Sequence, residues 1–303
     1  MSESRRGFLF GVTAYVLWGA FPLYWPLLEP AGAIEILAHR IVWSGLTLGL
    51  LVLVLRRRAQ FLAILHDARA LKLLLVAAAT ISVNWATYIW AVNNNHVVEA
   101  SLGYFINPLV SVAMGVLILK ESLRRLQWLA IAIALIAVVV LTLDYGKPPW
   151  VALVLACSFG TYGLAKKLAG VGAVESLGFE TLAIAPFAAA YLGWLGVQGQ
   201  SSFLDRGPWV ALLFVSTGIV TAIPLICFGA AAIRVPMVTL GLLQYLAPIL
   251  QFALGVFWFH ESMPPARWIG FVLVWIALVL LTFEAYGHRR RQLKIAAEAS
   301  TAV

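Results

Sequence analysis

The sequence contains ten polar or ionisable side chains that interrupt apolar segments and could bind a ligand or carry a proton. Arg40 could attract an anionic group. The adjacent His39 is a candidate for proton coupling, because histidine titrates near neutral pH. Glu180 could accept a proton or form a gate. The other candidates could hydrogen-bond to a ligand, and they are Asn84, Tyr88, Tyr104, Asn107, Gln244, Tyr245 and Gln251.

Each candidate also has a purely structural interpretation. Arg40 could extend to the membrane interface or pair with another side chain, because placing arginine at mid-bilayer costs at least about 2.5–3.5 kcal/mol. Glu180 could stay hydrated near a membrane surface, and the amides and phenols could hydrogen-bond between helices. Trp85 and Trp90 could stack on a ligand, but tryptophans near an interface more often act as anchors. His39 and Arg40 are neighbours on a helix, about 100° apart, so they need not face the same way.

The spacing of the candidates predicts which of them share a helical face. Residues three, four or seven positions apart lie on one side of a helix, and three sets have this spacing. Residues 93–99, between the first two sets, are expected to form a solvated turn with no part in binding. The predicted sets are Asn84 with Tyr88, Tyr104 with Asn107, and Gln244 with Pro248 and Gln251.

Long apolar segments must position these residues. The chain has 303 residues, of which 62% are hydrophobic and 11% charged, whereas a soluble domain is about half apolar and a quarter charged. A membrane-spanning helix needs about 20 mostly apolar residues. The sequence therefore predicts an all-α polytopic membrane protein with ten transmembrane helices: 7–27, 35–55, 71–92, 99–119, 126–143, 149–166, 177–197, 208–229, 236–259 and 266–285.

The net charge of +8 reflects membrane topology better than nucleic-acid binding, because the basic residues lie in short loops. Cys157 and Cys227 fall inside apolar segments, which favours packing over a disulfide or a metal site, and no cofactor is expected. With ten spans, 17 of the 21 Lys and Arg residues fall on one side, which predicts that both termini are cytoplasmic. The four on the outer side are Arg40, Lys147, Arg206 and Arg267.

An internal repeat is visible at an offset of 140 residues. The pattern Pro108, Gly115 and Glu121-Ser122 returns as Pro248, Gly255 and Glu261-Ser262. Each predicted half has five spans, so the second half enters the membrane inverted, and a substrate site is expected near the midplane between the halves. Glu121 and Glu261 are interpreted as helix ends and not as ligands. The predicted divisions are a first five-helix repeat (1–146), a second, inverted repeat (147–287) and a cytoplasmic basic tail (288–303) whose last residues are disordered.

These two halves resemble EamA-type members of the drug/metabolite transporter superfamily, which end the fourth span of each half with the same Pro, Gly and Glu-Ser pattern. A finer resemblance is to RarD-type permeases. It rests on Asn84-Trp85, Tyr88 to Asn93, Glu99 to Pro108, His39-Arg40 and Glu180-Thr181. The second half differs, because Gln244-Tyr245-Leu246-Ala247 replaces Tyr104-Phe105-Ile106-Asn107 before the shared proline, so a site between the halves must be chemically asymmetric.

The resemblance implies a permease of the plasma (inner) membrane, associated by family name with chloramphenicol sensitivity. We expect a secondary transporter that exports a small organic metabolite or drug by alternating access, with proton coupling through His39 and Glu180. Its expected partners are the small-molecule substrate and the lipid bilayer, without nucleic acid, and a homodimer is compatible with the pattern. A channel or a membrane scaffold is the alternative. An enzyme is disfavoured because no nucleophile elbow, metal-ligand cluster or nucleotide-binding loop is present in the sequence.

Overall fold

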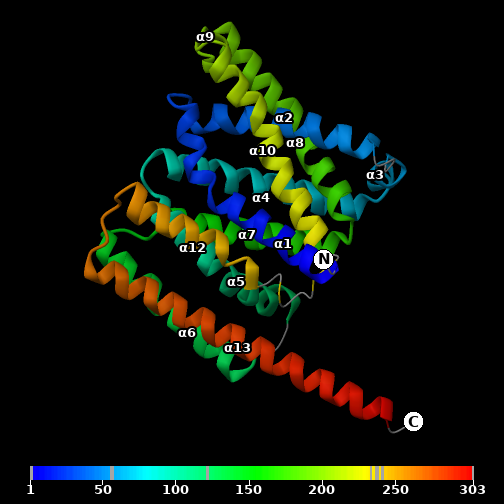
Figure 1. Ribbon diagram of the computed structural model, residues 1–303, viewed down its shortest axis with the longest axis vertical. Helices are drawn as coiled ribbons and strands as arrows, with labels where there is room; N and C mark the ends of the chain where they lie inside the picture. The colour runs from blue at the N-terminus through cyan, green and yellow to red at the C-terminus, as the bar shows by residue number, and fades with distance from the viewer. Residues whose placement is uncertain are drawn as a thin grey trace.

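The computed structural model describes residues 3–54, 58–120, 123–232, 234–235, 239 and 242–301. Every regular element in these ranges is helical (Figure 1). Short helices are α3 (Arg58–Ile64), α9 (Ser202–Asp205), α12 (Leu246–Ala253), the 3₁₀ turns η1 (Phe21–Leu23) and η2 (Trp25–Leu28), and the π-helix η3 (Leu254–Trp258). The longer helices are α1 (Glu3–Gly19), α2 (Ala33–Val54), α4 (Ala68–Asn93), α5 (Val97–Leu119), α6 (Arg125–Tyr145), α7 (Trp150–Ala169), α8 (Ala173–Val197), α10 (Pro208–Ala232) and α13 (Pro265–Thr301).

Eight of the described helices are long and apolar enough to cross a membrane: α2, α4, α5, α6, α7, α8, α10 and α13. The first expected span is a bent pair, in which α1 is followed at an angle of 40° by the turns Phe21–Leu28. Pro22 and Pro26 lie in these turns and cannot continue an α-helical hydrogen-bond ladder. The ninth expected span is represented by the shorter apolar helix Leu246–Trp258, and most of 236–241 lies outside the described residues. The count of ten therefore stays a prediction.

Local chemistry explains where several helices begin and end. The Asp67 carboxylate accepts hydrogen bonds from the backbone N–H groups of Arg69 and Ala70, which caps the start of α4. Gly146 follows α6 with φ of 66°, a left-handed conformation that glycine adopts without a side-chain penalty. At the end of the chain the expectation of a disordered tail is wrong, because α13 continues as a helix to Thr301.

The most extensive helix contacts join residues before 147 (the first half) to residues after 146 (the second half). The packed pairs are α6 with α13, α4 and α5 with α7, α2 with α8, and α10 with both α1 and α2. In Figure 1, α6 and α13 run side by side along one edge of the bundle. Ion pairs of Arg267 with Asp144 and of Arg124 with Glu284 tie the two ends of this pair. The two halves are therefore interleaved in one helical bundle.

Close backbone approach makes this interleaving feasible. Gly218 on α10 lies against α2, where an added Cβ atom would be 2.5 Å from the carbonyl oxygen of Trp43. Gly103 on α5 approaches α7 in the same way, with the Ala152 carbonyl oxygen 2.8 Å from the Cβ position. Small residues at such crossings let two helices approach closely and gain van der Waals contacts with each other.

Replacing Gly218 with alanine should destabilise the protein, because the neighbouring atoms are backbone and Thr47 Oγ1, which lies 2.9 Å from the Cβ position. We expect Gly218→Ala to lower the free energy of unfolding by about 1–3 kcal/mol, as for other overpacked sites. The matched control is Gly163→Ala, where no atom lies within 4 Å and the helix should be unchanged or slightly stabilised. Denaturant unfolding in mixed micelles measures both variants. Equal stability of the two would contradict the proposed contact.

Candidate functional site

Arg40 lies at the centre of the bundle with only 3% of its surface exposed. Its Nε donates a hydrogen bond to Thr221 Oγ1 on α10 at 3.0 Å, which links the two halves of the chain. Its guanidinium carbon lies 4.0 Å from the ring centroid of Trp85 on α4 and 5.1 Å from that of Trp25. The aromatic faces thus replace part of the hydration that arginine loses on burial.

Tyr88 and Tyr104 approach Arg40 from α4 and α5 and add phenol groups to its surroundings. Their rings meet edge to face at 5.6 Å. The Tyr104 hydroxyl donates to Asn84 Oδ1 at 3.2 Å, whereas the buried Tyr88 hydroxyl lies beside the Gln251 side chain but makes no hydrogen bond of standard geometry among the described residues. Asn84 in turn donates from Nδ2 to the Leu155 carbonyl oxygen and to Ser158 Oγ on α7.

Gln251 brings the second half to the same place. It is buried on α12, its Nε2 donates to the Trp18 carbonyl oxygen at 3.2 Å, and its side chain lies beside Tyr88. Its Oε1 has no hydrogen-bond partner among the described residues. We call the following set the central polar cluster: Arg40, Asn84, Tyr88, Tyr104 and Gln251. The structure thus assembles five of the ten candidates, from α2, α4, α5 and α12.

His39 lies away from this cluster although it is the neighbour of Arg40. Its ring stacks on Phe203 at 4.9 Å and packs against Phe214 at 4.3 Å. Both ring nitrogens are buried without a hydrogen-bond partner among the described residues. The helical twist between positions 39 and 40 therefore directs the two side chains to different neighbours, as the 100° step allows.

Glu180 is 2% exposed, so the interpretation that it stays hydrated near a surface is wrong. One of its oxygens lies 3.2 Å from Lys166 Nζ and accepts a hydrogen bond from Ser176 Oγ at 3.0 Å. The other oxygen is buried and makes no hydrogen bond of standard geometry among the described residues, although the Tyr162 side chain lies close to the carboxylate. Glu180 also lines a small cavity together with Trp85, the ring nearest to Arg40 among the described residues.

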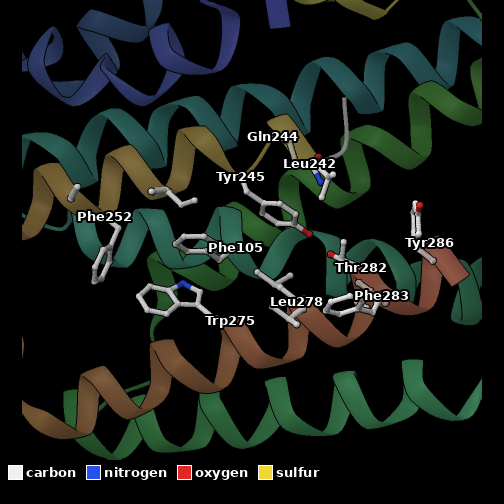
Figure 2. A pocket seen from close by; sticks show the side chains of 15 residues that line it. Phe105, Leu242, Gln244, Tyr245, Phe252, Trp275, Leu278, Thr282, Phe283 and Tyr286 are labelled. Carbon is white, nitrogen blue, oxygen red and sulfur yellow. The ribbon is translucent and has the colours of Figure 1, made fainter. Parts of the chain in front are cut away.

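Gln244 and Tyr245 line a different space, a pocket of about 970 Å³ between α5, α12 and α13. Figure 2 shows Tyr245 pointing into it toward Thr282, with Phe105 and Trp275 on the apolar walls. Gln244 and Gln251 were expected to share a helical face, but α12 begins only at Leu246 and Gln244 lies in the preceding turn. That prediction is wrong, because the turn interrupts the helical register.

This pocket opens where the protein surface is apolar. Ile249 and Phe283 on its rim are 51% and 72% exposed, as expected for side chains that a bilayer covers. No residue of the central polar cluster lines it. Asn107, the remaining candidate, lies one turn after Tyr104 on α5, and its Oδ1 is buried without a described partner.

The solvated turn expected at residues 93–99 is shorter than predicted. Asn94 and Asn95 form an exposed turn, but α5 begins at Val97 and Glu99 is 3% exposed. Glu99 accepts a hydrogen bond from the Val151 backbone N–H at the start of α7. Glu261 binds the start of α5 in the same way, accepting from the N–H groups of Val97 and Val98. Carboxylates favour helix N-termini, where unpaired N–H groups converge. Each of the two therefore holds a helix of the other half.

The residues that complete the Arg40 environment were missed by sequence reasoning, or assigned another role. Trp85 was interpreted as an interface anchor, yet it is the closest ring to Arg40. Trp25, Phe21 and Thr221 were not candidates. The available signal was the arginine itself, since a cation inside an apolar helix requires aromatic or hydrogen-bonding neighbours.

The fold and these residues can now be compared with known proteins. The family model described as "EamA-like transporter family" matches the chain twice, at residues 5–143 and 148–283. A solved crystal structure with 21% sequence identity aligns with a TM-score of 0.58 over 92% of this chain and 97% of its own. At that identity it supports the fold alone.

Relatives with curated names cover nearly the whole chain. The protein is 59% identical over 290 residues to "Protein RarD" of Streptomyces exfoliatus, covering 96% of this chain and 92% of that protein. It is 39% identical to "Protein RarD" of Escherichia coli strain K12 (96% and 99% covered). "Chloramphenicol-sensitive protein RarD" of Pseudomonas aeruginosa is 32% identical (96% and 98% covered). The chain belongs to the EamA-like transporter family, as a RarD-type permease, and is a multi-pass membrane transporter.

Glu261, at the start of α5, is expected to make the folding stability depend on pH. Burial raises the pKa of its carboxyl from 4.5 to about 7, outweighing the hydrogen bonds from Val97 and Val98 and the charge of Arg267. Between these pH values the folded chain binds more protons at Glu261 than the unfolded chain does. The contribution of this group to folding stability should therefore be fully present below pH 4.5 and be lost as the pH rises to about 7.

Thermal unfolding of the detergent-purified protein between pH 4.5 and 8 measures this effect, with Glu261→Gln expected to flatten the decline. The control is Glu3→Gln, which changes an exposed carboxylate. A decline of equal size in the Glu261→Gln variant would assign the pH dependence to other groups.

Proposed function

We propose that this protein is a secondary transporter that exports a small organic molecule across the plasma membrane by alternating access. Its proposed architecture is ten transmembrane helices in two inverted five-helix repeats, at residues 1–146 and 147–287. The double match of the family model and the residue pattern repeated at an offset of 140 support this division. The basic loops support cytoplasmic termini, with the 288–301 extension of α13 on the same side.

The central polar cluster is the observation that carries the proposal. Four of its members are buried and Tyr104 is partly buried, and they lie between helices of both halves, with Arg40 bound to Thr221 and Tyr88 beside Gln251. A static scaffold gains little from unpaired polar groups in an apolar interior, because each costs free energy when it has no hydrogen bond. A site that takes up and releases a polar solute needs such groups. The site is thus proposed for the interface between the repeats, as in other inverted-repeat transporters.

Contacts at the helix ends supply the proposed gate. In the proposed topology the Glu261 bonds to the start of α5 close the outer side of the bundle. Glu121, the equivalent residue of the first repeat, lies outside the described residues. Rocking of the repeats would break the Glu261 bonds and open a path from the central polar cluster to the outside.

Glu180 is the proposed proton-coupling group. It is buried, has one oxygen that makes no hydrogen bond of standard geometry among the described residues, and lines a small cavity together with Trp85 next to the cluster. Protonation would weaken its ion pair with Lys166 on α7 and so alter helix packing in the second half. His39 is the weaker candidate, because the phenylalanine rings around it provide no partner for an imidazolium ion.

Flux through reconstituted proteoliposomes tests the proposal. The panel contains chloramphenicol, which the name of the Pseudomonas relative suggests, together with aromatic carboxylates and amino acids. We expect saturable flux of at least one compound, accelerated by a pH gradient. Glu180→Gln should retain flux but lose the acceleration, while Glu3→Gln should behave like the unmodified protein.

Flux that equals that of protein-free liposomes for every compound would contradict transport. Flux that rises linearly with concentration would indicate a channel. Saturable flux that ignores the pH gradient would remove the coupling role of Glu180 and leave the transport proposal in place.

A further inference from the structure

We propose that the substrate is an organic monocarboxylate whose carboxylate group binds the guanidinium of Arg40. This inference rests on the proposed function, since it names the class of molecule that the central polar cluster would carry. The starting observation is a permanent cation at 3% exposure with no ion pair to any carboxylate among the described residues. Arginine stays charged in proteins, so the charge cannot be removed by deprotonation.

The neighbours of Arg40 compensate only part of its lost hydration. Removing an ion of this size from water costs several kcal/mol even after relaxation of the protein. Cation–π contacts return part of this cost, and among the rings of the described residues only that of Trp85 lies as near as 4.0 Å. The hydrogen bond to Thr221 uses one of the five N–H donors. The two terminal nitrogens make no hydrogen bond to the described part of the chain, so an acceptor is lacking there.

Among the described residues, no carboxylate of the protein acts as the acceptor for the terminal nitrogens of Arg40. Glu180, which lines a small cavity together with Trp85, is bound to Lys166 and Ser176. Glu99 and Glu261 are bound to helix N-termini. The polar neighbours of Arg40 are the neutral phenols of Tyr24, Tyr88 and Tyr104. The acceptor that Arg40 lacks is therefore expected to arrive with the substrate.

Charge and geometry select a monocarboxylate. The central polar cluster carries one positive charge, so a monoanion neutralises it and a phosphate dianion would leave excess negative charge in an apolar interior. The guanidinium is planar, and its position is restricted by Trp85, over whose ring Arg40 Cζ lies at 4.0 Å from the centroid. Two parallel N–H donors match the two oxygens of a carboxylate. The Tyr88 hydroxyl can donate a further bond to the anion.

Gln251 lies next to the position proposed for the carboxylate, because its side chain is beside Tyr88. Its Nε2 donates to the Trp18 carbonyl oxygen, which fixes the amide orientation and leaves Oε1 as a buried acceptor without a described partner. Because Gln251 lies beside Tyr88, this acceptor belongs to the same site. We expect the substrate to carry a hydrogen-bond donor, such as a hydroxyl or an amine, close to its carboxylate.

Binding to the full-length purified protein tests the inference without requiring transport. The probes are benzoate and its neutral isostere benzamide, with phenyl phosphate and chloride as further anions, and the readouts are thermal stabilisation and quenching of tryptophan fluorescence. We expect saturable binding of benzoate, at least about tenfold weaker binding of benzamide, and no tighter binding of phenyl phosphate or chloride.

The variants separate the effect of the Arg40 guanidinium on binding from general effects on folding. Arg40→Gln should abolish the preference for benzoate over benzamide. Arg40→Lys, which keeps the charge but loses the paired donors, should weaken benzoate binding about tenfold or more. Thr221→Val is the milder variant if Arg40→Gln does not fold, and it should reduce the preference. Arg267→Lys, at an arginine paired with Asp144, is the matched control and should bind as the unmodified protein does.

Equal binding of benzoate and benzamide would overturn the inference, as would an unchanged preference in Arg40→Gln or tighter binding of phenyl phosphate. Saturable flux of another compound without any benzoate binding would overturn the inference and leave the proposed function standing. Arg40-dependent benzoate binding without flux of any compound would support the site and overturn the proposed function.

Discussion

The absence of water from the membrane interior is the constraint on which the arrangement around Arg40 depends. A permanent cation in this environment must collect its own solvation shell from the protein. Arg40 does so with the rings of Trp85 and Trp25 and the hydroxyl of Thr221, which come from three separate segments and from both halves of the chain. Because the shell cannot form from one half alone, the charge couples the folding of the two halves. A buried arginine thus positions α2, α4 and α10 against one another.

The same constraint acts at the helix ends, where unpaired backbone N–H groups need acceptors. Here the acceptors are carboxylates, and each belongs to the opposite half: Glu99 binds the start of α7, Glu261 the start of α5, and Glu35 the N–H of Ser202 at the start of α9. A cap within one half would stabilise that half as a rigid unit. A cap between halves can be broken when the halves move, at the cost of exposing a carboxylate to water, where it is well solvated. Interleaved packing in the middle of the bundle and crossed caps at the helix ends thus both join the two halves.

The parts of the molecule that depend on short-range patterns were predictable from the sequence. Apolar length identified the eight long helices, and helical spacing placed Asn84 and Tyr88 together, because one continuous helix contains both. Predictions failed where a turn or a distant contact decided the outcome. Gln244 and Gln251 lie on opposite sides of a helix start, which spacing alone does not reveal. The burial of Glu99 depends on the N-terminus of α7, some fifty residues away, and the role of Trp85 depends on a side chain of another helix.

Arg40 and Glu180 occupy equivalent positions, 140 residues apart, yet the structure treats their charges differently. Glu180 is neutralised by Lys166, from the neighbouring helix of its own half. Arg40 is surrounded by neutral groups, and its closest contacts are aromatic. If both charges only stabilised the fold, a counter-ion from the chain would be expected at both positions. One position instead has its counter-ion in the chain and, among the described residues, the other does not. This difference is the reason for proposing an anion site at Arg40 and a separate proton-coupling role at Glu180.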